Sequence, residues 1–175
     1  TGIGAGIFID GQLVRGSRGA AGEISFLPLF GNLEDPWAIE NGLLESVVGT
    51  KGIIKRYQDL TQSKQAITVK EIFALANSRE EKAMLVVEEV GKYIGYVSAC
   101  IKAVADPELI IIGGGIGSNP VLLPIIRRWA NKLVPFEIKI ESTKLDVKAG
   151  VIGAAAYAAE KIRTRMMVET TERRK

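Results

Sequence analysis

The chain has 175 residues, of which 47 % are hydrophobic and 25 % charged, and it carries a net charge of +3 without any histidine. This balance is typical of one soluble globular domain with a sizeable core, and no apolar run approaches the roughly 20 residues of a membrane-spanning helix. The missing histidine and the single cysteine exclude a Ser/His/Asp triad, a Cys/His dyad, an internal disulfide and a Cys/His zinc site. We therefore expect a cytoplasmic protein that does not associate with membranes.

The net charge is concentrated at the C-terminal end. From Glu160 onward, six basic residues stand against three acidic ones, so this segment alone carries +3 and the remaining body is neutral. A neutral body argues against a broad nucleic-acid surface, because phosphate binding needs clustered basic charge. The basic end could contact DNA or lipid, although such tails are more often solvated termini.

The N-terminal segment predicts a β-hairpin. Two short apolar runs at 7–9 and 12–14 flank Asp10 and Gly11, a dipeptide that favours a tight turn between antiparallel strands. The chain therefore enters the fold through two paired strands.

A glycine-rich loop is predicted over residues 16–23, because this stretch is too rich in glycine for a helix or a central strand. It leads into the apolar segment 24–29, "ISFLPL", which we expect to be a strand that Pro28 ends or places at a sheet edge. A lone carboxylate, Glu23, lies between the loop and this apolar run.

The middle of the chain predicts helices. Apolar residues recur at helical spacing over 43–60, and two glycines within this stretch should divide it into two helices. Thr68 and Glu71 form the capping-box pattern, which predicts a short helix that ends at about Asn77.

The longest predicted helix runs from about Arg79 to Ala105. Its apolar residues recur at spacings of three and four, which indicates a face that packs against the core. Cys100 lies within this helix, and we interpret it as a small buried hydrophobic residue rather than a reactive thiol.

The last third of the chain predicts a β-α-β-α order. Residues 109–112 form an apolar run bounded by glycines, typical of a strand that is buried on both faces. A helix should begin near Asn119, a strand should follow over 136–142, and a helix of small residues suited to close packing should begin near 149. The whole order predicts an α/β domain in which helices pack against a mixed sheet.

Two turns are unusually rich in glycine: residues 2–6, "GIGAG", and residues 113–117, "GGGIG". Glycine lets backbone N–H groups approach a phosphate closely, and a following helix N-terminus adds favourable partial charge. Neither turn matches the Walker pattern, and the second lacks the spacing of a dinucleotide fingerprint. Each turn alone could equally be structural.

Taken together and in this order, the motifs resemble the C-terminal lobe of the ROK family (repressor, open reading frame, kinase) over residues 1–161. The segment "TGIGAGIFIDGQLVRGSRGAAGEI" is similar to the family's second phosphate turn, hairpin and sugar-contacting loop, "DPELIIIGGGIG" to its nucleotide-side strand and turn, and "AGVIGAAAYA" to its closing helix. The resemblance implies a ribonuclease-H-like fold, shared by actin-like ATPases and sugar kinases. Residues 162–175 remain as a basic tail that we expect to be disordered or a helix extension.

The resemblance also assigns ligand-binding roles. Glu23 would accept hydrogen bonds from sugar hydroxyls, for which a carboxylate offers two acceptor oxygens, whereas the alternative is an ordinary surface acid on a loop. The residues assigned to a nucleotide, if one binds, lie in the two glycine turns: Thr1, Gly2 and Gly4 around the β- and γ-phosphates, and Gly114 and Gly115 along the nucleoside.

The chain departs from the pattern of the family's kinases. Ser25 and Phe26 replace the Gly-His pair that usually follows the sugar-binding glutamate, and no cysteine precedes Cys100, so we expect no zinc site and no other metal. The family's catalytic aspartate lies in the N-terminal lobe, upstream of Thr1. We therefore expect no catalytic residue in this chain and no phosphoryl transfer by this chain alone.

This zinc-free pattern is more similar to the family's transcriptional regulators. The preferred hypothesis is a sugar-sensing effector domain that binds a sugar or sugar phosphate, forms a homodimer and reaches DNA only through an upstream module. The alternative is the C-terminal half of a glucokinase-like sugar kinase that uses ATP and Mg²⁺. A third hypothesis is a structural dimerisation lobe with the helix over 79–105 as its interface. We interpret Trp37 and Trp129 as packing residues rather than sugar-stacking residues.

Overall fold

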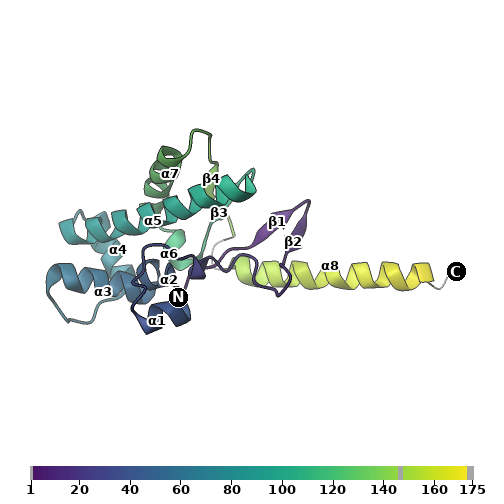
Figure 1. Cartoon of the computed structure of the whole chain (residues 1–175), viewed down its shortest axis with the longest axis horizontal. Helices are drawn as coiled ribbons and strands as arrows, with labels where there is room; N and C mark the ends of the chain where they lie inside the picture. The colour runs from purple at the N-terminus through teal and green to yellow at the C-terminus, as the bar shows by residue number, and fades with distance from the viewer. Residues whose placement is uncertain (1, 146–147, 173–175) are drawn as a thin grey trace.

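The computed structural model describes the backbone of residues 2–145 and 148–172, and side chains as far as residue 166 with the exception of residue 164. Figure 1 shows a helical body at one end of the molecule, from which a small hairpin and the last helix extend. Thr1, assigned above to a phosphate site, lies outside the described residues.

The predicted hairpin is confirmed. Strands β1 (Ile7–Ile9) and β2 (Gln12–Val14) are antiparallel, and the first residue of β1 pairs with the last of β2. Asp10 and Gly11 both have positive φ, at 50° and 75°, as a two-residue turn of this hand requires.

The prediction of a strand over residues 24–29 is wrong, because this segment begins with a short 3₁₀ helix, η1 (Ile24–Phe26). Local bonds satisfy its backbone: the Ile24 N–H donates to the carbonyl of Gly22 (2.7 Å), and the Leu27 N–H donates to that of Ile24 (3.0 Å). Pro28 then lacks a donor for any sheet ladder. The apolar composition of this segment reflects packing against the core and not a strand.

Five helices follow along the chain: α1 (Pro36–Asn41), α2 (Glu45–Val48), α3 (Thr50–Thr61), α4 (Val69–Asn77) and α5 (Glu81–Ala105). Gly49 separates α2 from α3, as predicted, whereas Gly52 lies inside α3. The capping box of α4 is confirmed: the Glu71 N–H donates to Oγ1 of Thr68 at 3.2 Å, and the Thr68 N–H donates to Oε2 of Glu71 at 2.7 Å.

The core lies where α5 packs against α7 (Leu122–Leu133), with α3 and α4 alongside (Figure 1). Two glycines of α5 let the helices approach closely: a Cβ on Gly91 would lie 2.5 Å from the Ile125 side chain, and one on Gly95 would lie 2.7 Å from that of Trp129. The largest fully buried side chains are Leu44, Ile53, Ile72, Val86, Val87, Leu122, Ile126 and Ile140.

The expectation that Cys100 is buried is wrong, because its thiol side chain is exposed. The core-facing stripe of α5 runs through the buried Val90 and Val97 and the half-buried Ile94 and Ile101 at spacings of three and four, and position 100 falls outside it. An apolar residue type alone did not place Cys100 on the core face.

The last third has the predicted order of elements. Strand β3 (Ile110–Ile112) is followed by a single turn α6 (Gly114–Gly117), α7, strand β4 (Ile140–Ser142) and α8 (Ala149–Glu172). β3 and β4 are parallel, with the first residues of the two strands paired. The chain is thus an α/β domain with one antiparallel and one parallel pair of strands among its described residues.

Two burial expectations for this region are wrong. Ile111 in the middle of β3 is 61 % exposed, because among the described residues no element covers the face of the strand on which it lies. Helix α8 extends away from the body instead of packing closely, and Val151 near its start is 76 % exposed (Figure 1). No helix in the described ranges is both long enough and apolar enough to cross a membrane.

Candidate functional site

The first glycine turn is in direct contact with the loop that carries Glu23. The Ala5 N–H donates to the carbonyl of Gly22 at 2.8 Å. Gly22 has a φ of +89°, and a Cβ at this position would lie 2.0 Å from the carbonyl oxygen of Ala5. Only glycine can meet both conditions. The backbone therefore carries Glu23 to the edge of the turn.

Glu23 is exposed at this edge, with its backbone in use and its carboxylate available. Its carbonyl accepts from the Phe26 N–H at 3.2 Å, and its own N–H donates to the Ala20 carbonyl at 3.3 Å. The side chain makes no capping bond to η1. Both carboxylate oxygens can therefore accept hydrogen bonds from a ligand.

The start of α2 joins the same site from a third segment of the chain. The Leu44 N–H donates to the carbonyl of Ser25 at 3.1 Å, and Ser25 is only 4 % exposed. Ser25, two residues after Glu23, is therefore fixed to Leu44, the residue before Glu45. The turn, the Glu23 loop and the start of α2 form one hydrogen-bonded unit.

Glu45 is a second carboxylate at this site, and the sequence reasoning missed it. Its Oε2 accepts from the Ile3 N–H at 3.2 Å. Its carboxylate also lies directly against Gly2, where a Cβ would come within 2.2 Å of Oε2. In the sequence Glu45 looks like an ordinary acid in the first turn of a helix, which the helix dipole favours, so no local motif marks it.

One further position of the first turn, Gly4, is open. Gly4 is exposed, and no atom lies within 4 Å of where its Cβ would be. Its backbone can therefore be approached by a ligand. The structure brings together Gly2, Gly4, Glu23 and Glu45.

The second glycine turn is built differently. Gly114 has a φ of +83°, and open space surrounds both Gly114 and Gly115, whereas a Cβ on Gly117 would lie 2.8 Å from Ile112. The Ser118 Oγ, just after the turn, is buried without a hydrogen-bond partner among the described residues. Within those residues, no hydrogen bond joins this turn directly to the Glu23 site.

The segment between Glu23 and Glu45 is held by apolar and aromatic contacts. Ala38 and Leu43 are buried, and the ring of Phe30 stacks on that of Tyr93 with centroids 4.2 Å apart.

In the described part of the chain, no group of three or more histidine, cysteine, aspartate or glutamate side chains could hold a metal ion. These residues do not fit a zinc ion.

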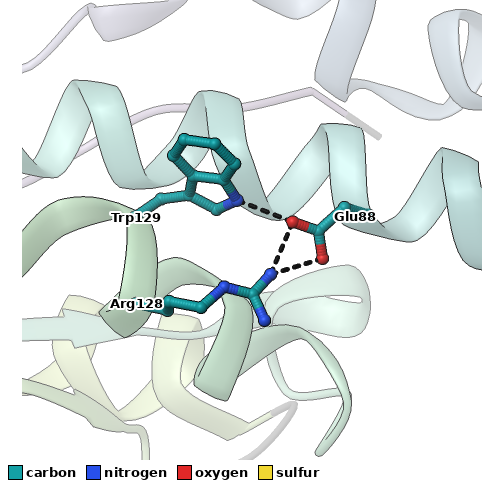
Figure 2. Close-up of polar contacts among 3 residues, drawn as sticks. All are labelled: Glu88, Arg128 and Trp129. Atoms are coloured by element: carbon teal, nitrogen blue, oxygen red, sulfur yellow. Dashed lines mark hydrogen bonds and ion pairs between the residues drawn. The ribbon is translucent and has the colours of Figure 1, made fainter. Parts of the chain in front are cut away.

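Both tryptophans lie outside the Glu23 site. Trp37 lies under the Lys51 ammonium, 4.4 Å from the ring centroid, at a cavity of about 400 Å³ between α1, α3 and α5. Trp129 packs edge-on against Tyr96, and its indole N–H donates to Glu88 at 2.7 Å (Figure 2). Packing and a hydrogen bond hold Trp129, whereas the half-buried Trp37 lines the cavity, and the interpretation of Trp37 as a packing residue stays a prediction.

Comparison with known proteins identifies relatives over nearly the whole chain. The sequence model of the ROK family matches residues 1–161. A glucokinase from Halalkalibacterium halodurans is 29 % identical over 173 residues, covering 87 % of this chain and 52 % of the relative. An N-acetylmannosamine kinase from Haemophilus influenzae is 31 % identical over 166 residues, covering 91 % and 53 %. The chain therefore spans about half the length of these curated relatives.

Solved structures agree on the fold. A ROK hexokinase from Thermus thermophilus superposes with a TM-score of 0.81 at 24 % identity, covering 93 % of this chain and 56 % of that one. A ROK family transcriptional regulator, a homologue of the E. coli MLC protein, superposes with a TM-score of 0.68 at 25 % identity, covering 81 % and 39 %. The chain has the predicted ribonuclease-H-like fold of actin-like ATPases and sugar kinases.

Proposed function

This chain belongs to the ROK family, and on that premise we propose that it is the C-terminal half of an ATP-dependent sugar kinase. The sequence alone favoured a transcriptional regulator and gave the kinase as the alternative. The relatives support the kinase better, because curated relatives that match most of this chain are named glucokinase and N-acetylmannosamine kinase.

One observation carries the proposal: the Glu23 loop is hydrogen-bonded to the first glycine turn through Ala5 and Gly22. Phosphoryl transfer depends mainly on positioning the accepting hydroxyl next to the transferring phosphate. A carboxylate that orients a sugar hydroxyl therefore has to lie beside a turn that receives phosphates. The contact supports such a pairing in this chain.

Within the proposal, each residue has a limited role. Glu23 binds and orients the sugar through its hydroxyls, and the N–H groups at Gly2 and Gly4 receive the terminal phosphates, for which the open space at Gly4 leaves room. Gly114 and Gly115 lie along the nucleoside. ATP with Mg²⁺ supplies the phosphoryl group when bound, and the general base belongs to the part of the protein outside this chain.

A sugar-sensing regulator is the second candidate. It is favoured by Ser25 and Phe26 at the positions of the family's Gly-His pair, and by the likeness to a solved regulator. In this case Glu23 still binds a sugar or sugar phosphate, while a homodimer passes the signal to DNA through an upstream module. The two candidates therefore share the sugar site and differ in phosphoryl transfer.

The deciding experiment measures ADP release by the full-length protein with ATP, Mg²⁺ and either glucose or N-acetylmannosamine. We expect sugar-dependent ADP release, and we expect Glu23→Gln to lower kcat/KM at least tenfold, about 1.4 kcal/mol, because the neutral amide loses a charge-assisted bond. Glu40→Gln, an exposed glutamate on α1, is the matched control and should behave as wild type.

The other outcomes separate the candidates. Sugar binding that raises thermal stability without ADP release would support the regulator and overturn the kinase. If the wild-type protein neither binds a sugar nor releases ADP, the kinase and the regulator are both overturned. An unchanged kcat/KM in Glu23→Gln would remove Glu23 from the site while leaving the kinase assignment standing.

A further inference from the structure

Phe30 has a backbone conformation that is unusual for a bulky apolar residue. Its φ is +67°, and it is the centre of a three-residue turn in which the Gly31 N–H donates to the carbonyl of Leu29 at 2.9 Å. Such a turn is rare and strained, because a Cβ is crowded against the backbone when φ is positive. Strain of this kind persists only where the surrounding structure compensates for it. The other described non-glycine residues with positive φ are all polar or charged: Asp10, Gln62, Arg79 and Asp106.

The compensation comes from aromatic side chains of α5. The Phe30 ring stacks on that of Tyr93, with centroids 4.2 Å apart and 16° between the ring planes, and its centroid lies 5.3 Å from that of Tyr96. Tyr93 is itself fixed, because its hydroxyl donates to Glu89 at 2.6 Å and Arg56 of α3 donates to the same carboxylate at 2.7 Å. Burial and the bond to Glu89 raise the pKa of Tyr93 to about 12, so the hydroxyl remains a donor at neutral pH. The strained turn therefore rests on a surface that α3 and α5 hold in place.

Short-range backbone bonds join this turn to Glu23. The Phe26 N–H donates to the Glu23 carbonyl at 3.2 Å, and the Leu29 N–H donates to that of Leu27 at 2.7 Å, with η1 between the two bonds. The Glu23 side chain is exposed and makes no capping bond to η1, so the place of its carboxylate depends on this backbone. A displacement of Phe30 is therefore passed along the segment to Glu23.

We propose that Phe30 is a positioning residue for the sugar site, a role that rests on the proposed function. By stacking on Tyr93 it holds the strained turn closed, and it thereby fixes the backbone from which Glu23 meets a sugar hydroxyl. A carboxylate that binds hydroxyls has to be in place before the ligand arrives, because small displacements weaken directional hydrogen bonds. The stack thus pre-organises Glu23 from a distance.

A purely structural role for the Phe30 ring has a different signature. Loss of packing alone lowers the fraction of folded protein, which reduces the number of binding sites while each folded molecule keeps its affinity. Loss of positioning leaves the protein folded and weakens its affinity for the sugar. The number of sites and the Kd therefore separate the two roles.

Four variants isolate the stack. Phe30→Gly removes the ring and relieves the positive φ, whereas Phe30→Leu keeps an apolar side chain and the strain but cannot stack. Phe30→Tyr keeps a stacking ring, and the adjoining cavity of about 400 Å³, which Phe30 lines, leaves room for the added hydroxyl. Phe136→Gly is the matched control, because Phe136 is 48 % exposed on the loop between α7 and β4.

The test is calorimetric titration of the full-length protein with glucose and with N-acetylmannosamine. We expect Phe30→Gly and Phe30→Leu to raise the Kd of the bound sugar about tenfold at an unchanged number of sites, because Glu23 loses its fixed position. Phe30→Tyr and Phe136→Gly should bind as wild type does. In the ADP-release assay, Phe30→Gly and Phe30→Leu should raise KM for the sugar and leave KM for ATP unchanged.

Several outcomes would overturn the positioning role while leaving the sugar site of the proposed function standing. These are an unchanged Kd in Phe30→Gly and Phe30→Leu, fewer sites or no folded protein instead of weaker binding, and a loss of affinity in Phe30→Tyr as large as in Phe30→Leu. If Glu23→Gln binds the sugar as tightly as wild type, Glu23 is outside the site and Phe30 loses this role with it. If the wild type binds neither sugar, the sugar site of the proposed function and the role of Phe30 are overturned together.

Discussion

At the scale of single residues, the site depends on backbone that only glycine can adopt. Gly22 combines a φ of +89° with a carbonyl oxygen, that of Ala5, 2.0 Å from where a Cβ would be. Because that neighbour is backbone, it cannot move aside cheaply. Any side chain at position 22 would therefore break the contact between the turn and the Glu23 loop.

Gly22→Ala should lower the free energy of unfolding by at least about 2 kcal/mol, from the left-handed φ and the backbone clash combined. It should also weaken sugar binding, because the Glu23 loop must move away from the turn. Gly6→Ala is the matched control: the φ of Gly6 is not positive, and the nearest neighbours would be 3.9 Å from the new Cβ. Urea unfolding of both variants checks the prediction, which fails if Gly22→Ala is as stable as Gly6→Ala.

The two carboxylates of the site show what the sequence could reveal at this scale. Glu23 follows a glycine run that matches a family motif, so its position could be predicted. Glu45 contacts Gly2 and Ile3 across 42 positions of sequence. Its contact depends on how α2 is placed by the Leu44 bond to Ser25, which no local spacing encodes.

At the scale of elements, the contact between α5 and α7 includes a polar cluster as well as the core. Glu88 on α5 accepts two bonds from the Arg128 guanidinium on α7, at 2.5 and 2.6 Å, and one from the Trp129 indole (Figure 2). Partial burial alone would raise the pKa of Glu88, but the hydrogen bonds from Arg128 and Trp129 outweigh it and lower the pKa.

Because the folded pKa is lowered, Glu88 stabilises the fold above the unfolded pKa of about 4.3, and the contribution is lost as the pH falls through the lower, folded value. Glu88→Gln should therefore cost about 0.5–1 kcal/mol at pH 7, a modest value because both side chains are partly exposed, and close to nothing at pH 3. Urea unfolding at the two pH values measures the difference. Glu108→Gln, on an exposed loop, should show no such dependence, and a cost in Glu88→Gln that is equal at both pH values would contradict the prediction.

Helices with strong local signals could be predicted from the sequence, and elements that depend on distant partners could not. The capping box of α4 and the apolar spacing in α5 predicted the ends of both helices to within two residues. Ile24–Phe26 has the composition of a strand, yet without a neighbouring strand its backbone closes local 3₁₀ bonds instead. The composition of a segment shows how apolar it is, but whether it forms a strand depends on a neighbouring strand that can pair with its backbone.

At the scale of the whole molecule, burial is uneven. The core gathers side chains from α2 to α7 and from β4, whereas no described side chain of α8 belongs to it. Exposed apolar residues lie on the helical body as well, such as Val104 on α5, and on the hairpin, on β3 and along α8, including Phe8, Ile111 and Ile162. The stability of this chain should therefore come almost entirely from its helical body.

Two isoleucines in helices provide a matched test of that division. Ile126 in α7 is fully buried, and Ile162 in α8 is 61 % exposed. Ile126→Ala should cost about 2–5 kcal/mol, because it removes buried methylenes and leaves a cavity. Ile162→Ala should stay within about 0.5 kcal/mol of wild type, because it removes little that is packed. Urea unfolding at two protein concentrations decides the matter: a large cost at Ile162 that grows with concentration would mean that α8 packs against a second copy, and a large cost independent of concentration would mean that it packs against its own body.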